Sequence, residues 1–67
     1  MDTKVIEGKW NEFTGAAKEK WGDLTDDEVK QAEGNTEKLI GIIQQKFGMS
    51  REAVEKEFDQ LKARLNL

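Results

Sequence analysis

The chain has 67 residues, with 14 acidic against 11 basic side chains, a net charge of −3, and no cysteine, histidine or proline. A chain of this length forms one domain at most, and without cysteine or histidine it has neither disulfides nor the usual ligands of a structural metal. An isoelectric point of about 4.9 argues against nucleic-acid binding, because such proteins normally present a basic face.

Apolar packing, helix caps or self-association must therefore stabilise this chain. Glu, Lys, Ala, Gln and Leu dominate the composition, and all are good helix formers. No apolar run approaches the ~20 residues that cross a bilayer, and Met1 to Lys4 lack the features of a signal peptide. We expect one α-helical domain over residues 1–67, in the cytoplasm and without a membrane partner.

The first predicted helix carries an apolar stripe at intervals of +3, +7 and +11, namely Trp10, Phe13, Ala17 and Trp21. Gly22 is expected to adopt the left-handed conformation just past the end of this helix. The segment from Thr3 to Ile6 either extends the helix or forms an arm whose Val5 and Ile6 fold over the core.

A second, short helix is predicted roughly from Asp26 to Glu33. Thr25 and Glu28 have the S/T-x-x-E spacing of a capping box, in which each residue satisfies an amide of the other. This helix is expected to bury Val29 and Ala32.

The third helix should begin with Asn35 or Thr36 as its cap and end at Gly48. Its inner stripe is Leu39, Ile40, Ile43 and Phe47. Because Ile42 lies outside this stripe, we expect the third helix to be the most enclosed.

Ser50 is the predicted cap of the fourth helix, although Ala53 leaves the capping box incomplete. Its apolar stripe is Val54, Phe58, Leu61 and Leu65. Glu52 and Lys56 lie on the solvent side in the favourable acid-before-base order.

An internal repeat relates the two halves of the chain. A shift of 26 residues sets residues 7–22 over residues 33–48 with five identities in sixteen positions, and Trp21 falls on Phe47. The repeat predicts two similar helical hairpins, at about residues 4–33 and 35–66, packed on each other.

Residues with catalytic potential are few. Ser50 is the only serine, it stands where a cap is needed, and no histidine could act as its base. The acidic residues from Asp23 to Glu28 are better explained as a helix start than as a metal site, since their spacing is not that of a calcium loop. We expect no catalytic, cofactor-binding or metal-binding residue.

Two tryptophans follow a lysine directly, at Lys9-Trp10 and Lys20-Trp21. Exposed rings beside a basic residue can stack on single-stranded nucleic acid. Both tryptophans lie on the apolar stripe, however, so packing in the core is the preferred interpretation.

Gly15 and Gly41 fall in the middle of predicted helices, where glycine costs roughly 1 kcal/mol relative to alanine. Three explanations stay open: neutral drift of a duplicated ancestor, close approach of another helix of the same chain, and a contact surface for a partner. The two glycines are a candidate contact surface, and the arm with Val5 and Ile6 is another face through which a partner could bind.

Residues 7–28 resemble the hallmark segment of the CsbD-like bacterial stress proteins, whose recurring pattern is W-x-x-x-x-G-x-x-K-E-x-W-G-x-L-T-D-D. The matching positions are Trp10, Gly15, Lys18, Glu19, Trp21, Gly22, Leu24, Thr25, Asp26 and Asp27. The second half also resembles the family, at Glu33, Gly34, Leu39, Gly41, Ile43, Gln44, Phe47 and Gly48. The ending Leu65-Asn66-Leu67 departs from the family's aromatic-rich tail.

The resemblance implies a four-helix domain of two crossed helical hairpins, similar to half-folds of the SAM-like class. It also implies a cytoplasmic protein that accumulates in general, osmotic or stationary-phase stress, with no enzyme activity, no cofactor and no mapped site. Three functions are compatible with it: a protective or accessory protein acting through a hydrated acidic surface, an adaptor for a protein partner, and a nucleic-acid-binding module. We favour the first, in a monomer.

Overall fold

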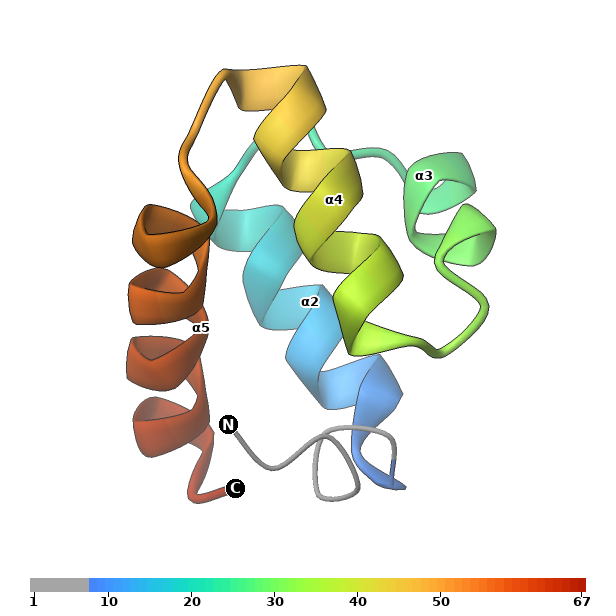
Figure 1. Cartoon of the computed structure of the whole chain (residues 1–67). Helices are drawn as coiled ribbons and strands as arrows, with labels where there is room; N and C mark the ends of the chain where they lie inside the picture. Colours follow the sequence, from blue (N-terminus) through green and yellow to red (C-terminus); the bar gives the residue numbers. More distant parts are fainter. Residues whose placement is uncertain (1–7) are drawn as a thin grey trace.

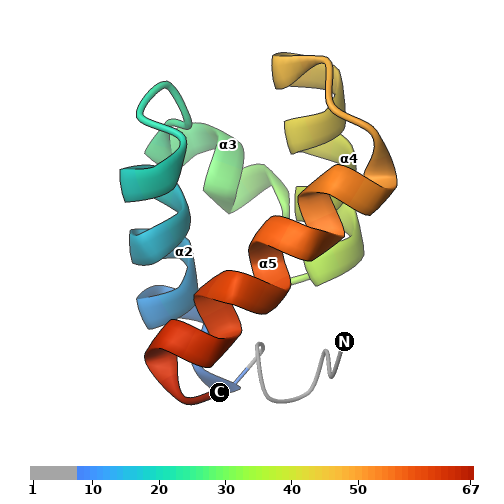
Figure 2. The same cartoon turned by 90° about the vertical axis from the view of Figure 1, so that its left-hand side faces the viewer.

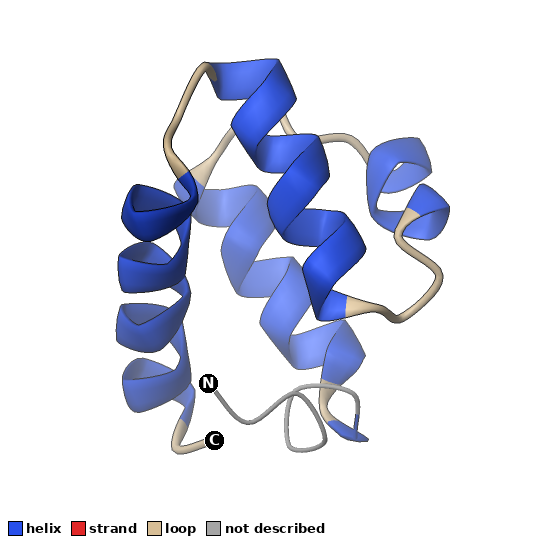
Figure 3. Ribbon diagram, viewed as in Figure 1, coloured by secondary structure: helices blue, strands red, loops and turns tan. Residues whose placement is uncertain are grey.

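The computed structural model describes residues 8–67, and every regular element in that range is an α-helix (Figure 3). The helices are α2 (Trp10–Lys20), α3 (Asp26–Gln31), α4 (Thr36–Phe47) and α5 (Arg51–Leu65). The expectation of an all-α fold with four helices and no strand is thus confirmed for this part of the chain. The segment from Thr3 to Ile6 lies outside the described residues.

Side-chain caps fix the beginnings of three helices, as the sequence predicts. At α3 the Glu28 amide donates to Thr25 Oγ1 at 3.2 Å, and the Thr25 amide donates to Glu28 Oε1 at 2.9 Å. Asn35 accepts a hydrogen bond of 3.2 Å at the start of α4, and Ser50 accepts one of 3.1 Å at the start of α5. Each cap satisfies an amide that has no partner within its own helix.

The helix ends follow the sequence prediction at Gly48 but not at Gly22. Gly48 ends α4 in the left-handed conformation, with φ of 66°. Among the described glycines only Gly34 and Gly48 have positive φ, so the left-handed prediction for Gly22 is wrong. The chain leaves α2 one residue earlier, at Trp21, where φ is −109° and ψ is 86°.

The second predicted helix is shorter than expected, because α3 ends at Gln31. Glu33 and Gly34 then take φ values of 54° and 72°, which turn the chain toward α4. A left-handed glycine costs nothing in this turn, whereas a left-handed glutamate is disfavoured.

The helices pack around α5, which makes principal backbone contacts with both α2 and α4. Figure 2 shows α5 crossing in front of the space between these two helices, while α3 lies at the other side of α4 in Figure 1. The third principal contact joins α3 to α4 rather than α3 to α2. The second hairpin, α4 with α5, is therefore a packed pair, whereas α3 rests on α4. The internal repeat stays a prediction.

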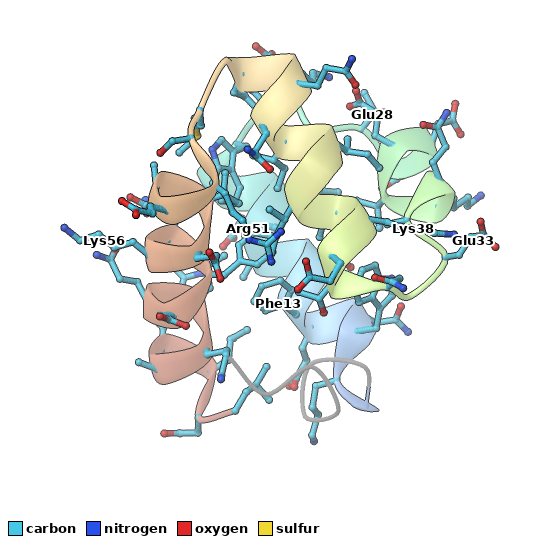
Figure 4. The ribbon with its side chains drawn as sticks, viewed as in Figure 1. Phe13, Glu28, Glu33, Lys38, Arg51 and Lys56 are labelled. Carbon is cyan, nitrogen blue, oxygen red and sulfur yellow. The ribbon has the colours of Figure 1, made fainter. Side chains whose placement is uncertain are left out.

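An aromatic cluster forms the centre of the core. The rings of Phe13 and Phe58 meet edge to face with centroids 4.8 Å apart, and Phe13 points into the middle of the molecule in Figure 4. Trp21 approaches Phe58 at 5.8 Å and is 8% exposed. The remaining buried apolar residues are Ala16, Ala17, Leu24, Val29, Ala32, Leu39, Ile40, Ile43, Val54 and Leu61.

The predicted stripes are buried in the middle of each helix and half-buried at the ends. Trp10, Phe47 and Leu65 pack against the core but remain partly exposed. Each is the first or last residue of its helix, where the neighbouring helices no longer cover it. Ile42 is only half-buried, whereas Leu39, Ile40 and Ile43 on the same helix are fully buried. Because α2 and α4 each bury four residues, the expectation that the third predicted helix is the most enclosed is not confirmed.

Buried polar groups are normally hydrogen-bonded, and Thr36 is the exception in the described core. Its side chain is 1% exposed, and within residues 8–67 Oγ1 has no hydrogen-bond partner. An unsatisfied buried hydroxyl costs about 1–3 kcal/mol.

Candidate functional site

Gly15 and Gly41, the candidate contact residues, lie in the middle of α2 and α4. Gly15 is half-buried and Gly41 is exposed. A Cβ atom added at either position would meet no described atom within 4 Å, and neither residue has a positive φ. Neither side-chain space nor backbone conformation therefore requires glycine here.

This geometry removes one of the three explanations for the two glycines. No other helix among residues 8–67 approaches their backbone, so the expectation of a close intramolecular approach is wrong. Neutral drift and contact with a partner stay open.

The residues considered for chemistry have structural roles. Ser50 Oγ accepts the hydrogen bond that begins α5. Glu28 is held from two sides: its carboxylate accepts from the Thr25 amide at 2.9 Å and from Lys46 Nζ at 2.6 Å. Within residues 8–67, no three Asp, Glu, His or Cys side chains gather closely enough to bind a metal ion.

Two carboxylates at the start of α3 are stabilised in their charged form. The hydrogen bond from Lys18 and the positive charge of Lys18 lower the pKa of Asp26 below its ordinary 3.8. The hydrogen bond from Lys46, followed by that from the Thr25 amide, lowers the pKa of Glu28 below its ordinary 4.5. A general acid needs a raised pKa, so these shifts run against acid catalysis.

Ion pairs connect every helix of the described chain to a neighbour. Lys20 of α2 pairs with Glu57 of α5 at 2.5 Å, and Arg51 of α5 pairs with Glu37 of α4 at 2.5 Å. Arg51 points from α5 toward α4 in Figure 4, and its hydrogen bond to Glu37 raises its pKa. The other pairs between helices are Lys18–Asp26, Lys46–Glu28 and Arg64–Glu19. Each exposed ion pair contributes little to the stability of the fold, so the effect of these pairs on stability depends on how many there are and where they lie.

An open hollow of about 350 Å³ lies along the seam between α3 and α4. Its lining residues are Glu28, Gln31, Ile42, Gln45 and Lys46. Sequence reasoning did not identify this hollow, although the position of Ile42 outside the apolar stripe was a signal of it. Nothing in the sequence pattern singled out Gln31 and Gln45, the two glutamines of this lining.

A second hollow of about 350 Å³ lies at the beginning of α2 and is lined by Gly8, Lys9, Trp10, Asn11 and Glu12. The two tryptophans therefore differ, because Trp21 belongs to the core and Trp10 borders the surface. The expectation that both indoles are buried is confirmed for Trp21 and only half met by Trp10.

No helix within residues 8–67 has the length and apolarity needed to cross a bilayer. Sequence comparison gives a match between residues 4–56 and the family model described as CsbD-like. The UPF0337 protein PA4738 of Pseudomonas aeruginosa is 46% identical over 65 residues, which cover 97% of this chain and 100% of that protein.

Two further relatives show the same degree of similarity. The UPF0337 protein YjbJ of Escherichia coli is 42% identical over 64 residues, 96% of this chain and 93% of its own length. A UPF0337 protein of Bordetella pertussis is 46% identical over 57 residues, 85% of this chain and 86% of its own length. No solved structure matches the chain significantly.

Proposed function

We propose, from the premise that this chain belongs to the CsbD-like family, that it is a non-enzymatic general stress-response protein of the bacterial cytoplasm. Its role is protective or accessory and is exerted through its charged surface. The observation that carries the proposal is a closed aromatic core beneath charges that are paired between helices.

A surface of this kind suits a protein that accumulates to high concentration. Charged residues make up 37% of the chain, and the mean hydropathy is −0.81. A net charge away from zero keeps copies apart, and most large apolar residues, Phe13, Phe58 and Trp21 among them, are buried in the core.

A client-protection assay tests this role. A heat- or drying-labile enzyme is stressed with the protein, or with an inert small protein of equal charge, and its residual activity is measured. The proposal requires clearly higher residual activity with this protein, and equal protection by the inert protein would refute it.

Two charge variants of the chain sharpen the assay. Asp23→Asn, Glu52→Gln and Asp59→Asn together change the net charge from −3 to 0, and all three carboxylates are exposed. The matched control replaces Lys30 and Lys56 by Gln. Protection should fall in the first variant and persist in the second, because the acidic groups supply the hydrated surface.

An adaptor function is the second candidate, and the open space at Gly41 is compatible with it. Gly15→Lys with Gly41→Lys covers both positions with a side chain that helices accept better than glycine. Affinity capture from stressed cells should then lose a partner that the original chain retains. If both proteins capture the same set, the glycines are no contact surface.

A further inference from the structure

The segment between Gly22 and Gly34 carries α3 and differs from the rest of the described chain in how it is held. We propose that this segment is a clasp, which opens as a unit while α2, α4 and α5 stay packed together. This inference goes beyond the proposed function and does not rest on it.

The clasp has little packing of its own. The six residues of α3 form less than two turns, which no isolated helix can maintain in water. Its principal backbone contact is with α4 alone. The buried apolar side chains of the segment are Leu24, Val29 and Ala32, at 4%, 9% and 0% exposure. The aromatic cluster of Phe13, Phe58 and Trp21 lies outside the segment.

Two lysines from the rest of the molecule hold the clasp shut at its N-terminal end. Lys46 of α4 contacts the Glu28 carboxylate at 2.6 Å and also donates to the carbonyl of Asp23. Lys18 of α2 pairs with Asp26 at 2.5 Å. These contacts converge on the N-terminal half of the segment, and a further pair of 3.0 Å joins Glu33, near its C-terminal end, to Lys38 of α4.

The two ends of the clasp can act as hinges. Gly22 at one end is exposed and has the backbone freedom of glycine, and a Cβ atom added there would have no neighbour within 4 Å. At the other end, Glu33 and Gly34 have φ of 54° and 72°. The left-handed conformation of Glu33 is strained, and this strain is released when the turn relaxes. The hollow of about 350 Å³ between α3 and α4 marks a seam that is incompletely filled.

Native-state hydrogen exchange of the full chain, followed by NMR, tests the clasp. The amides of Val29 and Ala32, which donate to the carbonyls of Thr25 and Val29 within the segment, should exchange through a smaller opening than those of α2, α4 and α5. In 1 M KCl, where screening acts over about 3 Å, protection in the clasp should fall more than protection elsewhere.

Lys46→Met removes the main polar tie while keeping the length of the side chain. Protection in residues 22–34 should fall about tenfold, the effect of one charge-assisted hydrogen bond, and the other helices should keep theirs. Lys56→Met is the matched control, because Lys56 points away from the body of the molecule (Figure 4). Lys18→Met serves as the second variant if Lys46→Met does not fold.

The outcomes separate the clasp from ordinary unfolding. If the amides of α3 exchange through the same opening as those of the aromatic core, the molecule unfolds in one step and the proposal is wrong. A uniform loss of protection in Lys46→Met and in Lys18→Met would refute it as well.

Discussion

Replacing the two mid-helix glycines by alanine should stabilise the protein. Gly15 is the sixth of 11 residues in α2, and Gly41 is the sixth of 12 in α4. A Cβ atom would meet no described atom within 4 Å at either site, so the change adds no steric cost. The gain comes from the unfolded state, where alanine has less backbone freedom to lose.

The magnitude follows from helix propensity. Each substitution should contribute about 1 kcal/mol to the free energy of unfolding. In a domain of this size 1 kcal/mol corresponds to a rise in Tm of about 4–8 °C. The double variant should therefore gain about 2 kcal/mol if the two sites act independently.

Gly48→Ala is the control for this prediction. Gly48 has φ of 66°, a conformation that alanine adopts only at a cost of about 1–2 kcal/mol, so this variant should lose stability. Urea denaturation and calorimetry measure the two single variants, the double variant, Gly48→Ala and the original chain. If Gly15→Ala and Gly41→Ala are neutral or destabilising while Gly48→Ala behaves as expected, the reasoning about open space is refuted.

Three further predictions follow from single contacts. Thr36→Val removes the buried hydroxyl without a partner and should raise the free energy of unfolding by about 1 kcal/mol, measured in urea; a loss would mean that the hydroxyl is satisfied. Acrylamide should quench Trp10 in a Trp21→Phe variant more strongly than Trp21 in a Trp10→Phe variant, and equal quenching would contradict the unequal burial. The folded state lowers the pKa of Asp26 and Glu28, so their contribution to the free energy of unfolding is complete above pH ~4.5 and is lost as the pH falls through the lowered pKa values. The double variant Asp26→Asn with Glu28→Gln should therefore flatten the acid limb of a pH–stability curve.

Local features of this fold could be predicted from the sequence because a few neighbouring residues determine them. Thr25, Asn35 and Ser50 each cap a helix, and a cap depends only on the side chain and the next three residues. Gly48 follows the same logic at the other end of a helix.

Features that depend on distant residues could not be predicted in this way. Gly22 occupies the repeat position of Gly48, yet Trp21 already leaves the helix and turns its indole toward Phe58. Similarly, α3 rests on α4 rather than on α2, and one contact between the two, Lys46 with Glu28, joins residues 18 apart in the sequence.

The candidate site was the least predictable part. Sequence spacing identified Gly15 and Gly41 as unusual, but only the coordinates could show that no other helix comes near them. The hollow between α3 and α4 is lined by Gln31 and Gln45 among others, and neither residue stands out in the sequence.

The position of α5 has a consequence for synthesis on the ribosome. Because α2 finds its principal partner in Arg51–Leu65, the first half of a nascent chain has no lasting tertiary partner. Phe13 can form its edge-to-face ring contact only with Phe58, which is translated 45 residues later. The aromatic core therefore cannot close before α5 has been translated.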